Sequence, residues 1–127
     1  MDTPFSLFNT YIHLQEGTGA VPVPVGEDFW ATIDQRTDLD AGRLVMAMHM
    51  TEDWDHWEMH PAGEEVLFLL WGDMDFILDT PVGEQQTRLT QGQALIVPRG
   101  VWHRALVLEP SNLLTITPGE GTQHRPL

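Results

Sequence analysis

Glycine and proline interrupt this chain of 127 residues at intervals too short for long helices. Both residue types end regular elements, so they divide the sequence into short pieces. The pieces rich in apolar residues are 43–50, 65–72, 74–79, 86–90, 94–98, 104–109 and 113–117. Such lengths are typical of strands in a barrel or sandwich. We therefore predict an all-β fold, in which the best helical candidate is only a turn near residues 27–34.

The N-terminal part of the chain is separated from the strand-rich part by residues 15–28, which contain closely spaced prolines. Proline cannot donate a ladder hydrogen bond, so this segment is predicted to be a loop or an extended edge. Before it, residues 6–14 alternate like a strand that adds to a sheet. Because edge strands need covering, exchange of this arm between two chains is expected to make a homodimer.

Charge and composition exclude several classes of partner. The chain has 19 acidic and 6 basic side chains, and its formal net charge of −13 would repel phosphate backbones and anionic membrane surfaces. Neither nucleic acid nor a membrane is therefore an expected partner. The absence of cysteine leaves histidine, carboxylate and carbonyl groups as metal ligands. Residues 1–10 lack the basic and apolar regions of a signal peptide, so we expect a cytoplasmic protein.

The densest group of chemically active side chains lies in residues 56–65, HWEMHPAGEE. On a strand, side chains two positions apart point to the same face, so His56, Glu58 and His60 would project together. The turn after them brings Glu65, at the start of the next strand, back toward the same space. This arrangement predicts a site where carboxylate and imidazole groups meet.

A further side chain comes from residues 92–103, in which an apolar strand and a Pro-Arg-Gly turn precede His103. The turn reverses the chain, so His103 could converge with Glu58, His60 and Glu65 from another strand. Without a cation, two carboxylates held close would repel each other, and one would have to take up a proton. A bound divalent ion removes this conflict, and we therefore predict a metal site.

The spacing of these residues resembles the first motif of the cupin family. Glu58, His60, Glu65 and Gly72 fall on positions of that motif, whose opening glycine is missing here. Glu58 stands where the family usually has its first metal-binding histidine. A carboxylate oxygen can replace an imidazole nitrogen as a ligand. His56 is the alternative ligand, since it lies two residues earlier with the same parity.

The second cupin motif is matched by Gly92, Pro98, Gly100 and His103, whereas Val107 stands at the place of its final asparagine. The two motifs lie in different parts of the chain, and each keeps its own spacing. The resemblance implies a jelly-roll barrel, the double-stranded β-helix of the cupins, as the fold.

The resemblance also implies a single cupin domain over residues 1–127, with a barrel core at roughly 40–118 and an N-terminal arm at 1–28. It further implies one bound divalent metal ion, for which Fe, Mn, Ni and Zn are the candidates. A set of two histidines and two glutamates favours the harder Mn²⁺ or Fe²⁺ over Ni²⁺ or Zn²⁺.

Three further side chains are candidates for the lining of a pocket near the ion. Trp71 shares the strand parity of Glu65, while Trp102 precedes a ligand and His49 lies on a strand that could neighbour the site. The alternative for the tryptophans is core packing.

Two functional classes fit these residues. The resemblance allows a metalloenzyme that acts on a small organic molecule by oxygenase, isomerase or lyase chemistry. The alternative that it allows is a non-catalytic protein that binds or senses a small molecule. No nucleophile or separate acid–base pair selects a reaction, so no catalytic residue is assigned. The lack of a helical DNA-binding segment argues against a self-contained transcriptional sensor, which favours catalysis.

Overall fold

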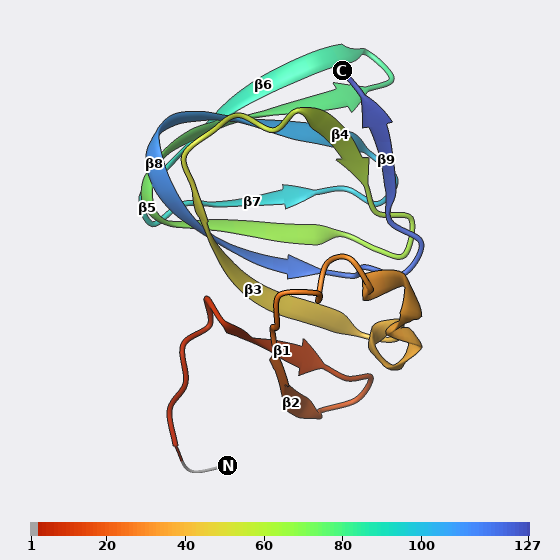
Figure 1. Cartoon of the computed structure of the whole chain (residues 1–127). Helices are drawn as coiled ribbons and strands as arrows, with labels where there is room; N and C mark the ends of the chain where they lie inside the picture. Colours follow the sequence, from red (N-terminus) through yellow and green to blue (C-terminus); the bar gives the residue numbers. More distant parts are fainter. Residues whose placement is uncertain (1–2) are drawn as a thin grey trace.

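The computed structural model describes residues 3–127, so the first two residues of the predicted arm 1–28 lie outside the described residues. The strands are β1 (Thr10–Leu14), β2 (Ala20–Pro24), β3 (Arg43–Met50), β4 (His56–Met59), β5 (Glu65–Thr80), β6 (Gly83–Thr90), β7 (Ala94–Val97), β8 (Trp102–Thr117) and β9 (Gln123–Pro126). Short 3₁₀ turns at Ile33–Gln35 and Thr37–Leu39 connect β2 to β3. The predicted all-β jelly-roll barrel is confirmed (Figure 1). Over residues 3–127, no helix has the length and apolar character needed to cross a membrane.

Two long strands, β5 and β8, form the centre of the barrel wall. Each has 16 residues, and they run antiparallel beside each other along most of their length. β5 also pairs with β6 and β7, while β8 also pairs with β3 and β4. In Figure 1 both strands curve around the barrel, so each contributes to more than one side of it.

The register of β5 against β8 shifts around Gly72. This glycine has a φ of +112°, a backbone conformation that residues with a side chain rarely adopt. Its backbone lies directly against Ser111. The Ser111 hydroxyl accepts a hydrogen bond from the Asp73 N–H at 3.0 Å and donates one to the Glu109 carbonyl at 2.7 Å. The serine thus satisfies backbone groups at the irregularity, as a side chain must where a ladder is interrupted.

Alternate residues of β5 fill the barrel core on both sides of this irregularity. Leu67 and Leu69 precede it, Met74 and Phe76 follow it, and all four side chains are fully buried. The buried parity therefore changes from odd to even numbers across Gly72. Burial of each such side chain contributes about 1.5–3 kcal/mol relative to its exposure to water.

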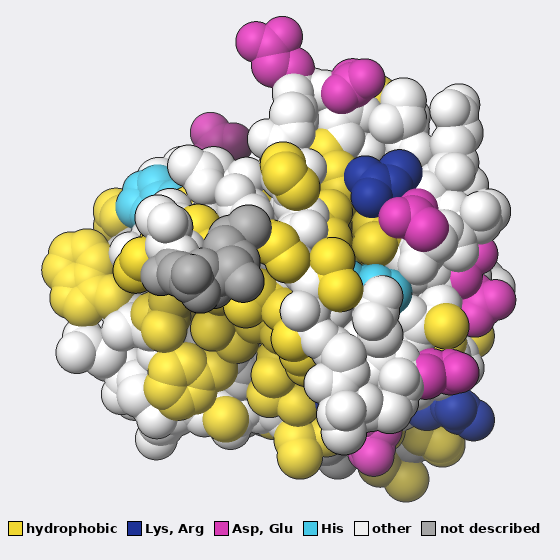
Figure 2. All heavy atoms as spheres, turned by 90° about the horizontal axis from the view of Figure 1, so that it is seen from below, with side chains coloured by type: hydrophobic (Ala, Val, Ile, Leu, Met, Phe, Trp, Pro, Cys, Tyr) yellow, Lys and Arg dark blue, Asp and Glu magenta, His cyan; other side chains and the backbone are white. Residues whose placement is uncertain are grey.

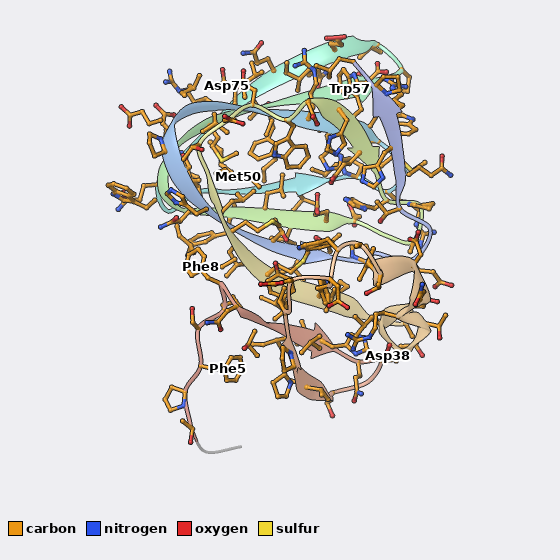
Figure 3. The ribbon with its side chains drawn as sticks, in the orientation of Figure 1. Phe5, Phe8, Asp38, Met50, Trp57 and Asp75 are labelled. Carbon is orange, nitrogen blue, oxygen red and sulfur yellow. The ribbon has the colours of Figure 1, made fainter. Side chains whose placement is uncertain are left out.

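The N-terminal arm forms the lower part of the molecule in Figure 1, where β1 lies antiparallel between β2 and β3 of its own chain. Tyr11 and Phe29 pack edge to face at 5.6 Å between ring centroids, and Trp30 joins them. Phe5 and Phe8 remain exposed on this arm (Figure 3). Figure 2, which views the molecule from below, shows hydrophobic side chains gathered on this face.

Candidate metal centre

The four predicted ligands come from the chain around β4, β5 and β8. Glu58 lies in β4, His60 follows the end of that strand, Glu65 begins β5, and His103 is near the start of β8. Glu58 and His103 are direct partners across β4 and β8, so their side chains share one face. His60, Glu65 and His103 are buried, whereas the Glu58 side chain keeps 25% of its surface exposed. The structure therefore brings all four residues together.

The turns beside these ligands are hydrogen-bonded to each other. The Gly100 N–H donates to the His60 carbonyl at 3.1 Å, and the Arg99 guanidinium donates to the Ala62 carbonyl at 2.8 Å. Gly100 has a φ of +74°, which favours glycine at this tight reversal. These contacts fix the distance between the loop that carries His60 and the strand that carries His103.

The donor atoms lie at distances that suit ligands of one ion. Glu65 Oε1 is 3.0 Å from His103 Nε2, and Glu65 Oε2 is 3.3 Å from His60 Nε2. Glu58 Oε2 is 3.9 Å from His60 Nε2. Glu58, His60 and His103 each offer one atom within 4.8 Å of the other two. Ligand atoms that share an ion at about 2.0–2.2 Å are spaced roughly 3–4 Å apart, so these separations fit a common ion.

Both imidazoles are held through Nδ1. His60 Nδ1 lies 2.8 Å from the Thr122 hydroxyl, which itself donates to the Gly119 carbonyl and must therefore accept from the ring. His103 Nδ1 donates to the Val101 carbonyl at 3.0 Å. In the neutral form of each ring, the proton is thus on Nδ1 and the lone pair is on Nε2. This tautomer, assigned from the hydrogen-bond network, is the one that a metal ligand needs.

The atoms that face the centre of the site lack hydrogen bonds. Within residues 3–127, His60 Nε2, His103 Nε2 and Glu65 Oε1 are buried and without a hydrogen-bond partner. The short contact between Glu65 and His103 is an ion-pair contact that is not aligned for a hydrogen bond. Buried polar atoms without partners are costly. A cation among them would satisfy all three, so the residues present fit a divalent ion.

Glu65 is the fixed negative charge of the site. Burial raises the pKa of its carboxyl group, but contacts with the imidazoles of His103 and His60 outweigh burial and lower the pKa to about 2. Thr117 adds a hydrogen bond to Glu65 Oε2 at 2.6 Å. Burial lowers the pKa of His103, but the Glu65 carboxylate outweighs it and raises that pKa above its usual value. Metal binding must displace any proton on His103, so metal affinity should rise with pH.

Acid unfolding of the metal-free protein should depend strongly on Glu65. Its pKa lies near 2 in the folded protein, against the ordinary value of 4.5 that we take for the unfolded chain. The carboxylate therefore stabilises the fold above pH 4.5, and this contribution disappears as the pH falls toward 2. In urea titrations, Glu65→Gln should lower the free energy of unfolding at neutral pH by about 3 kcal/mol and flatten its decline with acid.

Glu64→Gln is the matched control for this experiment, because the Glu64 side chain is exposed. Its acid dependence should equal that of the wild type. An equally steep decline in Glu65→Gln between pH 4.5 and 2 would show that Glu65 is not the responsible carboxyl group.

Trp54 forms an aromatic wall beside the site, a role that sequence analysis did not assign to it. Its ring centroid lies 5.9 Å from that of His103 and 6.3 Å from that of His56, and it is nearly parallel to the His56 ring. Trp54 also packs edge to face against Phe76 of the core. An apolar ring at this place limits solvent access to the imidazoles and thereby strengthens electrostatic interactions in the site.

The residues expected to line the pocket lie elsewhere. Trp71 is 57% exposed, because the register shifts on either side of it turn its side chain outward. His49 is exposed, and its Nδ1 lies 2.7 Å from Asn112 Oδ1. The Arg125 guanidinium lies over the Trp102 ring, 4.6 Å from the ring centroid. Trp102 therefore lies on the strand face opposite that of its neighbour His103. Hence none of the three lies where the pocket was expected.

His56, the alternative ligand, belongs to a different group of side chains. Its Nε2 lies 3.2 Å from Glu58 Oε1, the oxygen that also lies 3.4 Å from His124 Nε2. His56, Glu58 and His124 offer atoms within 4.8 Å of one another. His56 therefore approaches Glu58 from the side away from His60.

Sequence analysis missed Thr117, Thr122 and His124. Thr122 and His124 lie in residues 118–127, which contain glycines and prolines and have no apolar alternation to mark a strand. The structure nevertheless places β9 beside β4, with His124 directly opposite Glu58. No local signal in the sequence identifies this pairing, because it depends on the tail returning to the barrel.

Comparison with known families assigns the chain to a class. The cupin domain family matches residues 43–117, a range that contains all four predicted ligands. The match covers more than half of the chain, so the protein belongs to the cupin domain family. Comparison with curated proteins gave no match.

Solved structures share the fold at low sequence identity. A cupin-2 domain protein from Shewanella frigidimarina has a TM-score of 0.52 and 20% identity, over 60% of this chain and 70% of that one. A protein from Neisseria meningitidis has a TM-score of 0.52 and 25% identity, over 60% of this chain and 74% of that one. Hydroxypropylphosphonic acid epoxidase from S. wedmorenis has a TM-score of 0.51 and 18% identity, and the match covers 59% of this chain but only 43% of the epoxidase.

Proposed function

We propose that this cupin is a metalloenzyme that acts on a small organic molecule, with one divalent ion held by Glu58, His60, Glu65 and His103. The observation that carries the proposal is the pair of buried Nε2 atoms on His60 and His103, which lack hydrogen-bond partners among residues 3–127. Each ring is fixed through its other nitrogen, as metal-binding histidines usually are. The Glu65 carboxylate faces both rings.

The bound ion would supply Lewis-acid or redox chemistry. Because two of its ligands are carboxylates, Fe²⁺ or Mn²⁺ is a better candidate than Ni²⁺ or Zn²⁺. Structures of hydroxypropylphosphonic acid epoxidase include Fe(II) and Co(II) forms, and this supports testing iron first. The residues of the chain have distinct roles in the site. Glu65 stays ionised, His60 and His103 direct Nε2 toward the ion, and Trp54 limits access of water.

An exchangeable coordination position separates the proposed enzyme from the alternative, a protein that only binds or senses a small molecule. The test loads the metal-free chain with Co²⁺ and adds azide as a small anionic probe. We expect the visible absorption of the cobalt form to change with saturable dependence on azide. The response should persist in His56→Ala, which removes a donor of the separate group around Glu58 Oε1, and adding His103→Ala to that variant should abolish it. A tightly bound Co²⁺ whose spectrum ignores azide would contradict catalysis and favour the alternative.

We also propose that two chains associate through the face formed by the N-terminal arm. Phe8 is 46% exposed there, among other hydrophobic side chains of the arm (Figures 2 and 3). Light scattering should return twice the chain mass of 14.4 kDa, and Phe8→Asp should return the single mass. Val82→Asp is the control, because Val82 is 85% exposed in the turn between β5 and β6. A wild-type protein that stays at 14.4 kDa at micromolar concentration would refute the dimer.

A further inference from the structure

Imidazole rings surround Glu58 along and across its strand. His56 and His60 flank it two positions away on either side in the sequence. His103 of β8 and His124 of β9 are its direct partners on the two neighbouring strands. Positions two apart on a strand and direct antiparallel partners point to the same face. Glu58 is therefore the common neighbour of every one of these rings.

The Glu58 carboxylate divides its oxygens between two groups of histidines. Oε2 faces the buried side, 3.9 Å from His60 Nε2. Oε1 faces the outer side, 3.2 Å from His56 Nε2 and 3.4 Å from His124 Nε2. The outer group is more open, with 36% of the His56 side chain and 57% of the His124 side chain exposed. A carboxylate placed in this way can bind one ion with each oxygen.

His56 is oriented in the manner of a metal ligand. Its Nδ1 donates to Asp55 Oδ1 at 2.7 Å, since a carboxylate only accepts. Its Nε2 lies within hydrogen-bond distance of Glu58 Oε1, at 3.2 Å, and a cation that displaced the Nε2 proton would find the lone pair directed toward that oxygen. A carboxylate that accepts from the far nitrogen raises the basicity of a histidine ligand, and such pairs are common around metals. His124 Nε2 approaches the same oxygen from β9, so three donors converge.

We propose that His56, Glu58 and His124 form a second site for a divalent cation such as Zn²⁺ or Co²⁺, joined to the buried site by the Glu58 carboxylate. The outer ion would have three protein donors, with the half-buried ring of His56 and the exposed ring of His124 beside it. It therefore keeps coordination positions for water or for an anionic group of a ligand. The proposal depends on the buried metal centre only through their shared ligand, Glu58.

Calorimetric titration of the metal-free full chain with Zn²⁺ tests this second site. We expect about two equivalents for the wild type, and about one for His56→Ala and for His124→Ala, which each remove an outer donor. His49→Ala is the control, because His49 is an exposed histidine outside both groups, and it should keep both equivalents. His60→Ala should lose the buried equivalent and keep the outer one.

Glu58→Gln supplies an independent measurement, because it should weaken both equivalents at once. The proposal is overturned if His56→Ala and His124→Ala each take up as many Zn²⁺ ions as the wild type. Failure of the buried site gives a different result, in which His60→Ala and the wild type have the same stoichiometry while His124→Ala loses one ion.

Discussion

Gly72→Ala should destabilise the protein by about 2–6 kcal/mol, a large part of the stability of an ordinary domain. An alanine here would have to adopt a φ of +112°, and its Cβ would overlap Ser111, whose Cα and Cβ lie only 2.6 Å away. Ser111 cannot move aside freely, because its hydroxyl is hydrogen-bonded to the backbone of both strands, at Asp73 of β5 and Glu109 of β8. Urea unfolding followed by circular dichroism measures the effect.

Gly83→Ala separates the two causes of this effect. Gly83 has the same φ of +112°, but a Cβ there would meet nothing within 4 Å. Its replacement should therefore cost only the backbone strain, about 1–3 kcal/mol. Equal losses of stability in the two variants would contradict close packing of Gly72 against Ser111.

His60→Ala and His103→Ala should each weaken binding of the buried ion more than about 100-fold, the upper range for loss of an outer-shell partner. Each change removes an imidazole Nε2 that faces the Glu65 carboxylate. Equilibrium dialysis against Fe²⁺ or Mn²⁺ measures the affinity. His103→Gln is the second variant, because it keeps much of the bulk of a fully buried side chain while removing the ring.

His49→Ala and His56→Ala are the controls for loss of the buried ion. His49 lies outside the site, and His56 approaches Glu58 from the outer side. Both variants should retain the buried ion at wild-type affinity. Retention by His103→Ala, with loss in His56→Ala, would show that the wrong pair of histidines was chosen.

Much of the fold could be predicted because the short apolar segments and their breaks are local features. The segments 65–72 and 74–79, predicted separately, are nevertheless one strand, β5. Gly72 bends that strand without ending it, since Ser111 satisfies the backbone there. In the same way, β8 continues through Pro110, a residue that usually marks the end of a strand.

The site was predictable where the alternation of side chains along one short strand determines which of them share a face. This holds for Glu58 in β4 and for His60, which directly follows that strand. The prediction was wrong where the face of a side chain was inferred by counting residues across a register shift. Counting from Glu65 placed Trp71 on the face of the ligands. The register shifts on either side of Trp71 instead point its side chain toward solvent. His124 was missed for another reason, because its place opposite Glu58 depends on long-range pairing of β9 with β4.

Elemental analysis of the untagged protein, purified without chelator, measures directly whether the chain carries a bound metal ion. We expect at least about one divalent ion per chain, with iron or manganese preferred over nickel and zinc, and one equivalent fewer in His60→Ala. Less than about a tenth of an equivalent, persisting after incubation with Fe²⁺, Mn²⁺, Ni²⁺ and Zn²⁺ in turn, would contradict a metal centre at Glu58, His60, Glu65 and His103.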